Sequence, residues 1–228
     1  MNIRERLNIS AYLVIGPGNC TQPVEEIVAA AVDEGFTCIQ IRSKISSARE
    51  MISILEKSAR VIHQLGKSDS VALLVDDRLD VVLAAREAGI KVDGVHVGQS
   101  DIPVEVCRKF LGEDSIVGLS ANTPEEFFSA NATQIDYFGV GPLHATDTKS
   151  DADEALGIEK ISALVNVSSL PIVVGGGVKV KDIPALAATG VEGFFVVSAV
   201  AGAQNPRLAA RELVTTWRKF STHGNFNT

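Results

Sequence analysis

The chain has 228 residues, of which 46% are hydrophobic, 21% are charged and 5% are aromatic. This is the balance of a globular protein, and the chain is long enough to bury a full core. The formal net charge is −7, and no cluster of lysine and arginine marks a nucleic-acid-binding surface. The acidic balance favours a small-molecule partner, and an anionic one would need local cations.

Targeting and membrane signals are not found in the sequence. The first ten residues lack the apolar region of a signal peptide, and no run of roughly 18 or more apolar residues predicts a membrane span. The three cysteines, Cys20, Cys38 and Cys107, are odd in number and widely spaced, which is typical of reduced thiols. We therefore expect a cytoplasmic protein with no membrane partner.

Short β-branched runs alternate with longer helical patterns along the chain. The predicted strands cover residues 11–15, 38–41, 71–75, 94–97, 115–119, 137–140, 172–174 and 193–197. The predicted helices cover residues 24–34, 47–65, 79–88, 104–110, 124–130, 158–167, 183–188 and 207–220. Eight strands, each followed by a helix, predict a (β/α)8 TIM barrel of the α/β class. A doubly wound sheet would more often carry a glycine-rich turn after its first strand.

The barrel accounts for the whole length of the chain. Such a fold needs roughly 200–250 residues, and no linker-like stretch divides the sequence. We expect a single domain over residues 1–228, in which the polar residues 221–228 form a frayed tail. Active sites of these barrels lie at the carboxyl ends of the strands, so polar residues that follow each apolar run are the candidates for function.

Cations and carboxylates follow the second, third and fourth predicted strands. Gln40, Arg42 and Lys44 alternate along an extended segment and so share one face, where Arg and Lys would bind a polyanion. Asp77 and Asp101 supply hard oxygen ligands of the kind Mg²⁺ prefers, together with phosphates and water. The alternatives are a solvated cationic loop and two aspartates that cap the following helices.

The later strand ends predict a second anion site. Ser120 follows the fifth strand, and the polar loop after the sixth carries Thr146, Thr148 and Lys149, which suggests a closing, anion-binding flap. Glycines 175–177 follow the seventh strand, and Ser198 follows the eighth. Backbone amides of these two loops commonly cradle a phosphate, although a tight turn without ligand or a plain surface loop would look similar. The two clusters suit two phosphorylated substrates.

These segments, in their order and spacing, resemble the thiamine-phosphate synthase (thiamine phosphate pyrophosphorylase) family over almost the whole chain. The motifs that carry the resemblance are Gln40-Ile41-Arg42-Ser43-Lys44, Asp77-Arg78, Gly94-Val95-His96-Val97-Gly98-Gln99-Ser100-Asp101, and Gly139-Val140-Gly141-Pro142 continuing to Thr146-Asp147-Thr148-Lys149. The chain departs from the family pattern at Asp76, where Asn is common, and at His144-Ala145, which replace Phe-Pro. It also has Gly175 where the family often has Ile.

The resemblance implies a transferase that joins 4-amino-2-methyl-5-hydroxymethylpyrimidine diphosphate to hydroxyethylthiazole phosphate, giving thiamine phosphate and pyrophosphate. It also implies that the C–O bond ionises first and that the thiazole nitrogen traps the pyrimidine-methyl cation. Arg42, Lys44 and Lys149 would be catalytic, because they would neutralise the leaving pyrophosphate. By carry-over, the pyrimidine diphosphate would contact Gln40, Arg42, Lys44, Asp76, Ser120 and Lys149; Mg²⁺ would bind Asp77 and Asp101; the thiazole phosphate would contact Thr146, Thr148, Gly177, Val197 and Ser198.

Three other interpretations remain at this point. A thiazole tautomerase-like isomerase shares the barrel but needs no diphosphate-binding cations or metal carboxylates, which this chain has. A sugar-phosphate epimerase would account for the glycine cradle but not for the cations of the second and sixth strands. A non-catalytic protein that binds thiamine precursors would need neither metal ligands nor a flap. The oligomeric state stays open.

Overall fold

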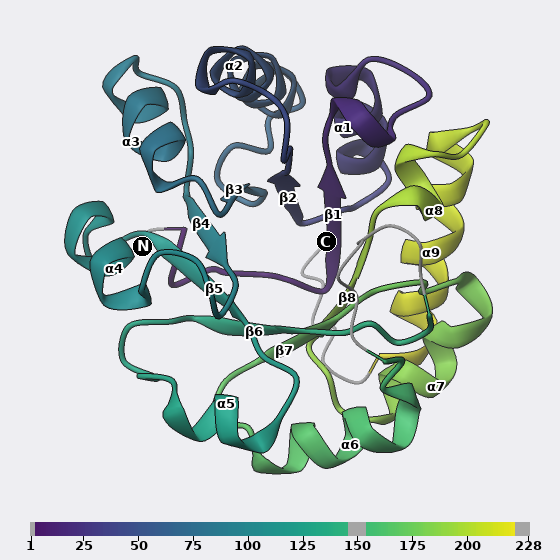
Figure 1. Cartoon of the computed structure of the whole chain (residues 1–228). Helices are drawn as coiled ribbons and strands as arrows, with labels where there is room; N and C mark the ends of the chain where they lie inside the picture. Colours follow the sequence, from purple (N-terminus) through teal and green to yellow (C-terminus); the bar gives the residue numbers. More distant parts are fainter. Residues whose placement is uncertain (1–2, 146–153, 222–228) are drawn as a thin grey trace.

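The computed structural model describes residues 3–145 and 154–221, in which a ring of helices surrounds a barrel of strands (Figure 1). The strands pair in sequence order, all in parallel, and the barrel closes where β8 pairs with β1. Their bounds are β1 Ala11–Ile15, β2 Cys38–Ile41, β3 Ala72–Asp76, β4 Gly94–Val97, β5 Ile116–Ser120, β6 Tyr137–Val140, β7 Ile172–Val174 and β8 Gly193–Val196. The predicted (β/α)8 barrel is confirmed.

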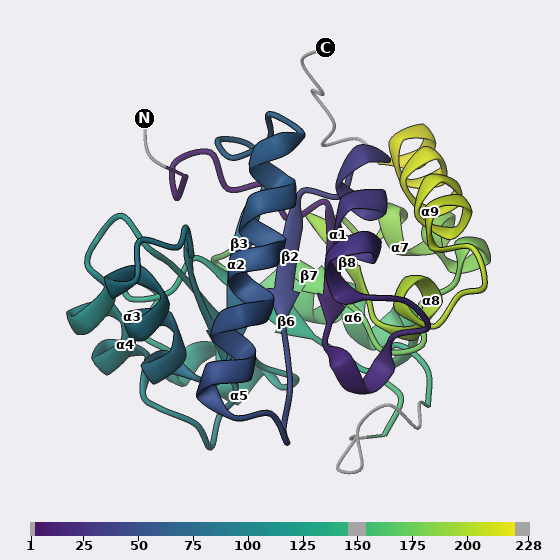
Figure 2. The same cartoon turned by 90° about the horizontal axis from the view of Figure 1, so that it is seen from above.

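The helices lie outside the strands, and α1 and α2 run side by side along the outer wall of the barrel (Figure 2). Their bounds are α1 Val24–Asp33, α2 Ala48–Gln64, α3 Leu79–Glu87, α4 Val104–Leu111, α5 Pro124–Ser129, α6 Gly157–Val167, α7 Ile183–Ala188, α8 Ser198–Ala201 and α9 Pro206–Phe220, with 3-10 turns η1 Pro17–Asn19 and η2 Val180–Asp182. Within residues 3–145 and 154–221, no helix combines the length and apolar character that crossing a membrane requires.

Two strands lie one residue later than the sequence predicts. β3 covers Ala72–Asp76 rather than 71–75, and β5 covers Ile116–Ser120 rather than 115–119. The prediction ended each strand at its last apolar residue. The structure continues the pairing, with Asp76 opposite His96 and Ser120 opposite Gly139. Both polar side chains are therefore held on strands, where their orientation is fixed, rather than on loops.

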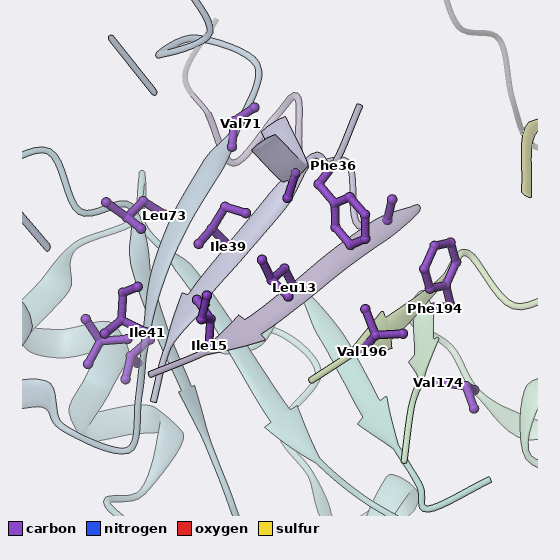
Figure 3. Close-up of a cluster of buried hydrophobic side chains, with 14 of the residues drawn as sticks. Leu13, Ile15, Phe36, Ile39, Ile41, Val71, Leu73, Val174, Phe194 and Val196 are labelled. Carbon is purple, nitrogen blue, oxygen red and sulfur yellow. The ribbon is translucent and has the colours of Figure 1, made fainter. Parts of the chain in front are cut away.

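The alternation of strand side chains divides the core into two parts. Outward-facing residues such as Leu13, Ile39 and Leu73 belong to one buried cluster with residues of the helices, and Figure 3 shows these side chains projecting from the strands. Inward-facing residues fill the barrel itself, and these include Ile9, Tyr12, Val14, Cys38, Ala72, Leu74, Ile116, Tyr137 and Val173. These residues fill the barrel interior, and the pocket described below lies toward the carboxyl ends of the strands.

The short elements α8, η1 and η2 were not predicted. Each contains only three or four residues, which is too short for a helical hydrophobic period to develop. The predicted tail at residues 221–228 falls outside the described residues except for Ser221, which follows α9.

Candidate active site

A pocket opens among the carboxyl ends of the strands, where barrel enzymes hold their active sites. Strands β1 to β8 and the loops after them contribute to its wall. The lining residues are Tyr12, Val14, Gln40, Arg42, Asp76, His96, Ser120, Asn122, Gly139, Val140, Gly141, Pro142, Val173, Gly176, Gly177, Val178, Phe195, Val196, Val197, Ser198 and Ala199. Seven residues predicted to bind substrate are in this lining: Gln40, Arg42, Asp76, Ser120, Gly177, Val197 and Ser198.

Arg42 and Asp76 form an ion pair inside the pocket. The Nε atom of Arg42 lies 3.0 Å from Oδ2 of Asp76, and the two side chains are 20% and 10% exposed. Gln40 donates through Nε2 to the other oxygen of the same carboxylate. In the part of the chain that the structure describes, Arg42 meets Asp76 through Nε, so its two terminal NH₂ groups can serve an anion.

Asp77 has an unusual backbone conformation that directs its side chain to the rim of the pocket. Its φ angle is 61°, a left-handed value that is uncommon for a residue other than glycine. The Asp77 amide donates to the His96 carbonyl at 2.8 Å and fixes this turn. The side chain then meets Lys44, with which it forms an ion pair, and Asp101.

The pKa values of Asp77 and Asp101 are shifted in opposite directions, although the two side chains are in contact. Burial acts to raise the pKa of Asp77, but hydrogen bonds with Lys44 and Asp101 outweigh it and leave that pKa below its usual value. Burial raises the pKa of Asp101, the Gly98 amide opposes the shift, and Asp77 adds to it. Two carboxyl groups in contact, with one ammonium beside them, form a site where an added cation would be stabilised.

Neither aspartate caps a helix, so that alternative is wrong. The residue at the N-cap of α3 is Arg78, and the one at the N-cap of α4 is Pro103. Asp101 Oδ2 instead accepts from the Gly98 amide at 2.9 Å, within its own loop. The carboxylates of Asp77 and Asp101 contact each other rather than the backbone amides at the start of α3 and α4.

The carboxylate pair fits Mg²⁺ in the character of its donors. Mg²⁺ takes hard oxygen ligands and usually binds one or two carboxylates, with water and substrate phosphates completing the shell. Residues 3–145 and 154–221 hold no cluster of three or more His, Cys, Asp or Glu side chains that would form a closed metal cage. Asp77 and Asp101 therefore suit an ion that arrives with a phosphorylated substrate.

The three glycines after β7 have different roles. A Cβ atom on Gly175 would lie 2.2 Å from the Phe195 ring, so this glycine allows Phe195 to pack inside the barrel. Gly176 and Gly177 have φ angles of 80° and 74° and line the pocket together with Ser198. These two, and not Gly175, form the glycine surface where an anion would approach the backbone closely.

The pocket also contains a tyrosine, Tyr12, in contact with a second one, Tyr137, and the sequence reasoning missed both. The hydroxyl groups of Tyr12 and Tyr137 lie 2.9 Å apart, and both side chains are buried. His96 Nδ1 lies 3.0 Å from the Tyr137 hydroxyl, and its Nε2 lies 2.9 Å from Ser120 Oγ. The signal was present: the only two tyrosines of the chain stand at inward-facing positions of predicted strands, where a buried hydroxyl needs a partner.

Six of the predicted site residues are not in the pocket lining: three stand together near it, and three lie outside the described residues. Lys44, Asp77 and Asp101 stand together at the rim, held by their mutual contacts. Thr146, Thr148 and Lys149, the predicted flap residues, lie outside the described residues. His144, which precedes them, has its Nε2 atom 3.1 Å from Asp182 Oδ2 and so connects this loop to η2.

Comparison with known proteins decides the family. The sequence profile described as thiamine monophosphate synthase matches residues 11–200. The chain belongs to this family. The thiamine-phosphate synthase of Vibrio parahaemolyticus is 38% identical over 204 residues, which cover 90% of this chain and 96% of the relative. That of Corynebacterium efficiens is 39% identical over 215 residues, covering 93% and 97%.

Solved structures agree with this assignment. The thiamine phosphate pyrophosphorylase of Pyrococcus furiosus superposes with a TM-score of 0.80 and 30% sequence identity, covering 96% of this chain and 99% of that one. A 3-hexulose-6-phosphate synthase superposes with a TM-score of 0.65 at 18% identity, a similarity that shows the fold alone. The chain is a thiamine-phosphate synthase by family, and hence a transferase that acts on small molecules.

Proposed function

We propose that the chain joins a pyrimidine diphosphate to a thiazole phosphate with release of pyrophosphate, in a Mg²⁺-assisted reaction. The observation that carries the proposal is the pairing of two anion sites across one pocket. Arg42 pairs with Asp76, the residue before the Asp77 of the Asp77–Asp101 carboxylate pair, at the β2–β3 side of the barrel, and the Gly176–Gly177 surface follows β7 across the barrel. One site suits a diphosphate with its metal, and the other suits a monophosphate.

The bond changes place specific demands on the residues. The bond between the pyrimidine methylene and the diphosphate oxygen breaks, and its electron pair leaves with pyrophosphate. The thiazole nitrogen then donates its lone pair to the methylene carbon and becomes positively charged. No proton has to be removed from either reacting atom, so the reaction needs stabilisation of the leaving group rather than a general base.

Arg42 and Lys44 would supply that stabilisation from the protein. Arg42 offers its terminal NH₂ groups to the diphosphate from within the pocket, and Lys44 adds a charge at the rim. Bound Mg²⁺ would contribute Lewis-acid neutralisation of the pyrophosphate charge, held by Asp77 and Asp101. Lys149 would bring a further cation to the same oxygens.

The remaining predicted residues would orient the two substrates. Gln40, Asp76 and Ser120 would contact the pyrimidine diphosphate from the pocket wall. Gly177, Val197 and Ser198 would hold the thiazole phosphate, with Thr146 and Thr148 completing that site. Anchoring the phosphate in this way would align the thiazole nitrogen with the methylene carbon and lower the entropic cost of the encounter. We propose that residues 1–228 act as one catalytic domain.

Product analysis tests this function. The purified protein is incubated with the pyrimidine diphosphate, with the thiazole phosphate and with both, and the products are separated by chromatography. We expect thiamine phosphate only in the mixture of both. Isomerisation of a thiazole carboxylate phosphate without condensation would favour a tautomerase, and tight binding without product would favour a non-catalytic binding protein.

Substitution of Gly177 by alanine is expected to weaken the thiazole phosphate site selectively. The added Cβ atom would lie 3.0 Å from the His144 Cβ atom, at a φ angle of 74° that side chains rarely adopt. We expect KM for the thiazole phosphate to rise roughly tenfold, the loss of about one hydrogen bond to a charged group. KM for the pyrimidine diphosphate should stay unchanged.

The matched control for this substitution is Gly190→Ala. Gly190 also has a left-handed φ angle, 86°, and its added Cβ atom meets only Val165 at 3.6 Å, while the residue does not line the pocket. This substitution therefore introduces a similar backbone strain at a position outside the pocket lining. Equal KM values for both variants would argue against a phosphate at Gly177. The measurement is steady-state kinetics with each substrate varied in turn.

A further inference from the structure

The glycine loop after β7 is held at two points by one residue of the loop after β6, His144. The His144 backbone amide donates to the Gly176 carbonyl at 3.0 Å. Its Cβ atom lies 3.0 Å from the position that a Cβ atom on Gly177 would take. Its ring then reaches η2, where Nε2 lies 3.1 Å from Asp182 Oδ2. We refer to this side-chain contact between His144 and Asp182 as the clasp.

We propose that the clasp positions the anion site, because it holds Gly176 and Gly177 where their backbone amides can meet a phosphate. His144 is thus a positioning residue, which acts on the ligand through the glycine loop. The inference rests on the proposed function for the identity of the ligand, a thiazole phosphate. It goes beyond that function by naming the two side chains that shape the phosphate site.

Two adjacent glycines need a restraint of this kind. Glycine has access to more backbone conformations than any other residue, and Gly176 and Gly177 both have left-handed φ angles, 80° and 74°. In the part of the chain that the structure describes, no protein acceptor takes the amide hydrogen of either glycine. Both line the pocket, and amides that are oriented before the anion arrives bind it at a lower entropic cost.

Asp182 can restrain His144 because its own element fixes it. Asp182 Oδ2 accepts from the Lys179 amide at 2.9 Å, and the Asp182 amide donates to the Lys179 carbonyl at 2.9 Å. These two hydrogen bonds close η2, and the next residue, Ile183, is fully buried. The Asp182 side chain is 12% exposed, whereas that of His144 is 47% exposed. The carboxylate is therefore the fixed end of the clasp.

The clasp needs no particular charge on the histidine ring. A histidine Nε2 atom can donate a hydrogen bond both in the neutral ring and in the protonated ring. Since half of the His144 side chain is exposed, the contact should contribute little to the stability of the whole fold. Its loss should instead change the local geometry of Gly176 and Gly177.

Replacement of His144 by phenylalanine should weaken phosphate binding at the two glycines. Phenylalanine keeps a flat ring but removes the Nε2 donor, and the net contribution of one hydrogen bond corresponds to a Kd about fivefold higher. Glutamine carries a donor of similar reach, so His144→Gln should restore a Kd within about a factor of two of the wild type.

The measurement is a nitrogen-15 NMR titration of the full chain, without substrates, with inorganic phosphate as the probe. The signals that report on the site are those of the Gly176 and Gly177 amides, which are identified by their loss in the corresponding alanine variants. The matched control is His63→Phe. His63 is an exposed histidine of α2, with Nδ1 3.4 Å from Ser68 Oγ, and it does not line the pocket. Its replacement should leave the Kd unchanged.

A double-mutant cycle shows whether His144 acts through Asp182. Asp182→Ala removes the other half of the clasp, so adding His144→Phe to it should cause no further loss of phosphate affinity. Losses that multiply would mean that the two residues act independently, and would overturn the proposal. A wild-type Kd in His144→Phe would also overturn it, as would glycine amides that do not respond to phosphate in the wild type.

Two further observations separate this proposal from the proposed function. In the active enzyme, His144→Phe should raise KM for the thiazole phosphate and leave KM for the pyrimidine diphosphate unchanged, whereas a general loss of structure would affect both. The expected phosphate titrations in a protein that forms no thiamine phosphate would contradict the function alone. If His144→Phe does not fold, His144→Ala removes the same donor and carries the same expectation.

Discussion

Replacing Arg42 by methionine should lower kcat by a factor of about 10²–10³, the loss expected when one preorganised donor to a developing charge is removed. Arg42 is held inside the pocket by Asp76, so its charge is already oriented before the substrate binds. The effect should appear in kcat more than in KM, because the charge on the pyrophosphate oxygen grows as the C–O bond breaks. Steady-state kinetics of pyrophosphate release measure it.

Two controls separate this effect from a loss of structure. Arg60→Met removes an exposed arginine that pairs with Glu56 on the outside of α2, and kcat should stay unchanged. Arg42→Lys keeps a positive charge but lacks the forked donors, so its kcat should fall between those of the wild type and Arg42→Met. A kcat of Arg42→Met within a factor of two of wild type would refute the assignment of Arg42 to the leaving group.

Replacing Asp77 by asparagine should raise the Mg²⁺ concentration needed for half-maximal rate by at least tenfold and lower kcat at saturating Mg²⁺. An amide retains one oxygen ligand but removes a negative charge, which weakens a site made from one or two carboxylates. Asp101→Asn should act in the same direction. Mg²⁺ titrations of the initial rate, at fixed saturating substrate, give both quantities.

The matched control for the metal site is Asp80→Asn. Asp80 lies three residues along the chain, on α3, and its carboxylate pairs with Arg78 at the surface. The substitution makes the same chemical change outside the site, so the Mg²⁺ dependence should not move. A Mg²⁺ dependence that is the same for Asp77→Asn, Asp80→Asn and the wild type would contradict a metal at Asp77 and Asp101.

The strand ends show how far sequence reasoning reaches in this fold. Period-two alternation placed Gln40 of β2 and Arg42, just after its end, on one face, and the structure has both in the pocket lining. The contact between Asp77 and Asp101 followed from the rule that neighbouring parallel strands bring their carboxyl ends together. These inferences use only the regular geometry of strands, which any sequence in the barrel must obey.

Other features depend on tertiary contacts that no local pattern encodes. The left-handed backbone of Asp77 is held by the carbonyl of His96, on the next strand. The need for glycine at 175 comes from the Phe195 ring on β8. Tyr12 and Tyr137, whose hydroxyl groups are hydrogen-bonded, are 125 positions apart in the chain, and closure of the barrel brings them together.

The measurement that tests the central claim most directly is pyrophosphate release by the purified protein, with each substrate and Mg²⁺ omitted in turn. We expect one pyrophosphate for each thiamine phosphate formed, and release only when the pyrimidine diphosphate, the thiazole phosphate and Mg²⁺ are all present. Release of pyrophosphate at the same rate after chelation of the metal, or no release from the complete mixture, would contradict the account.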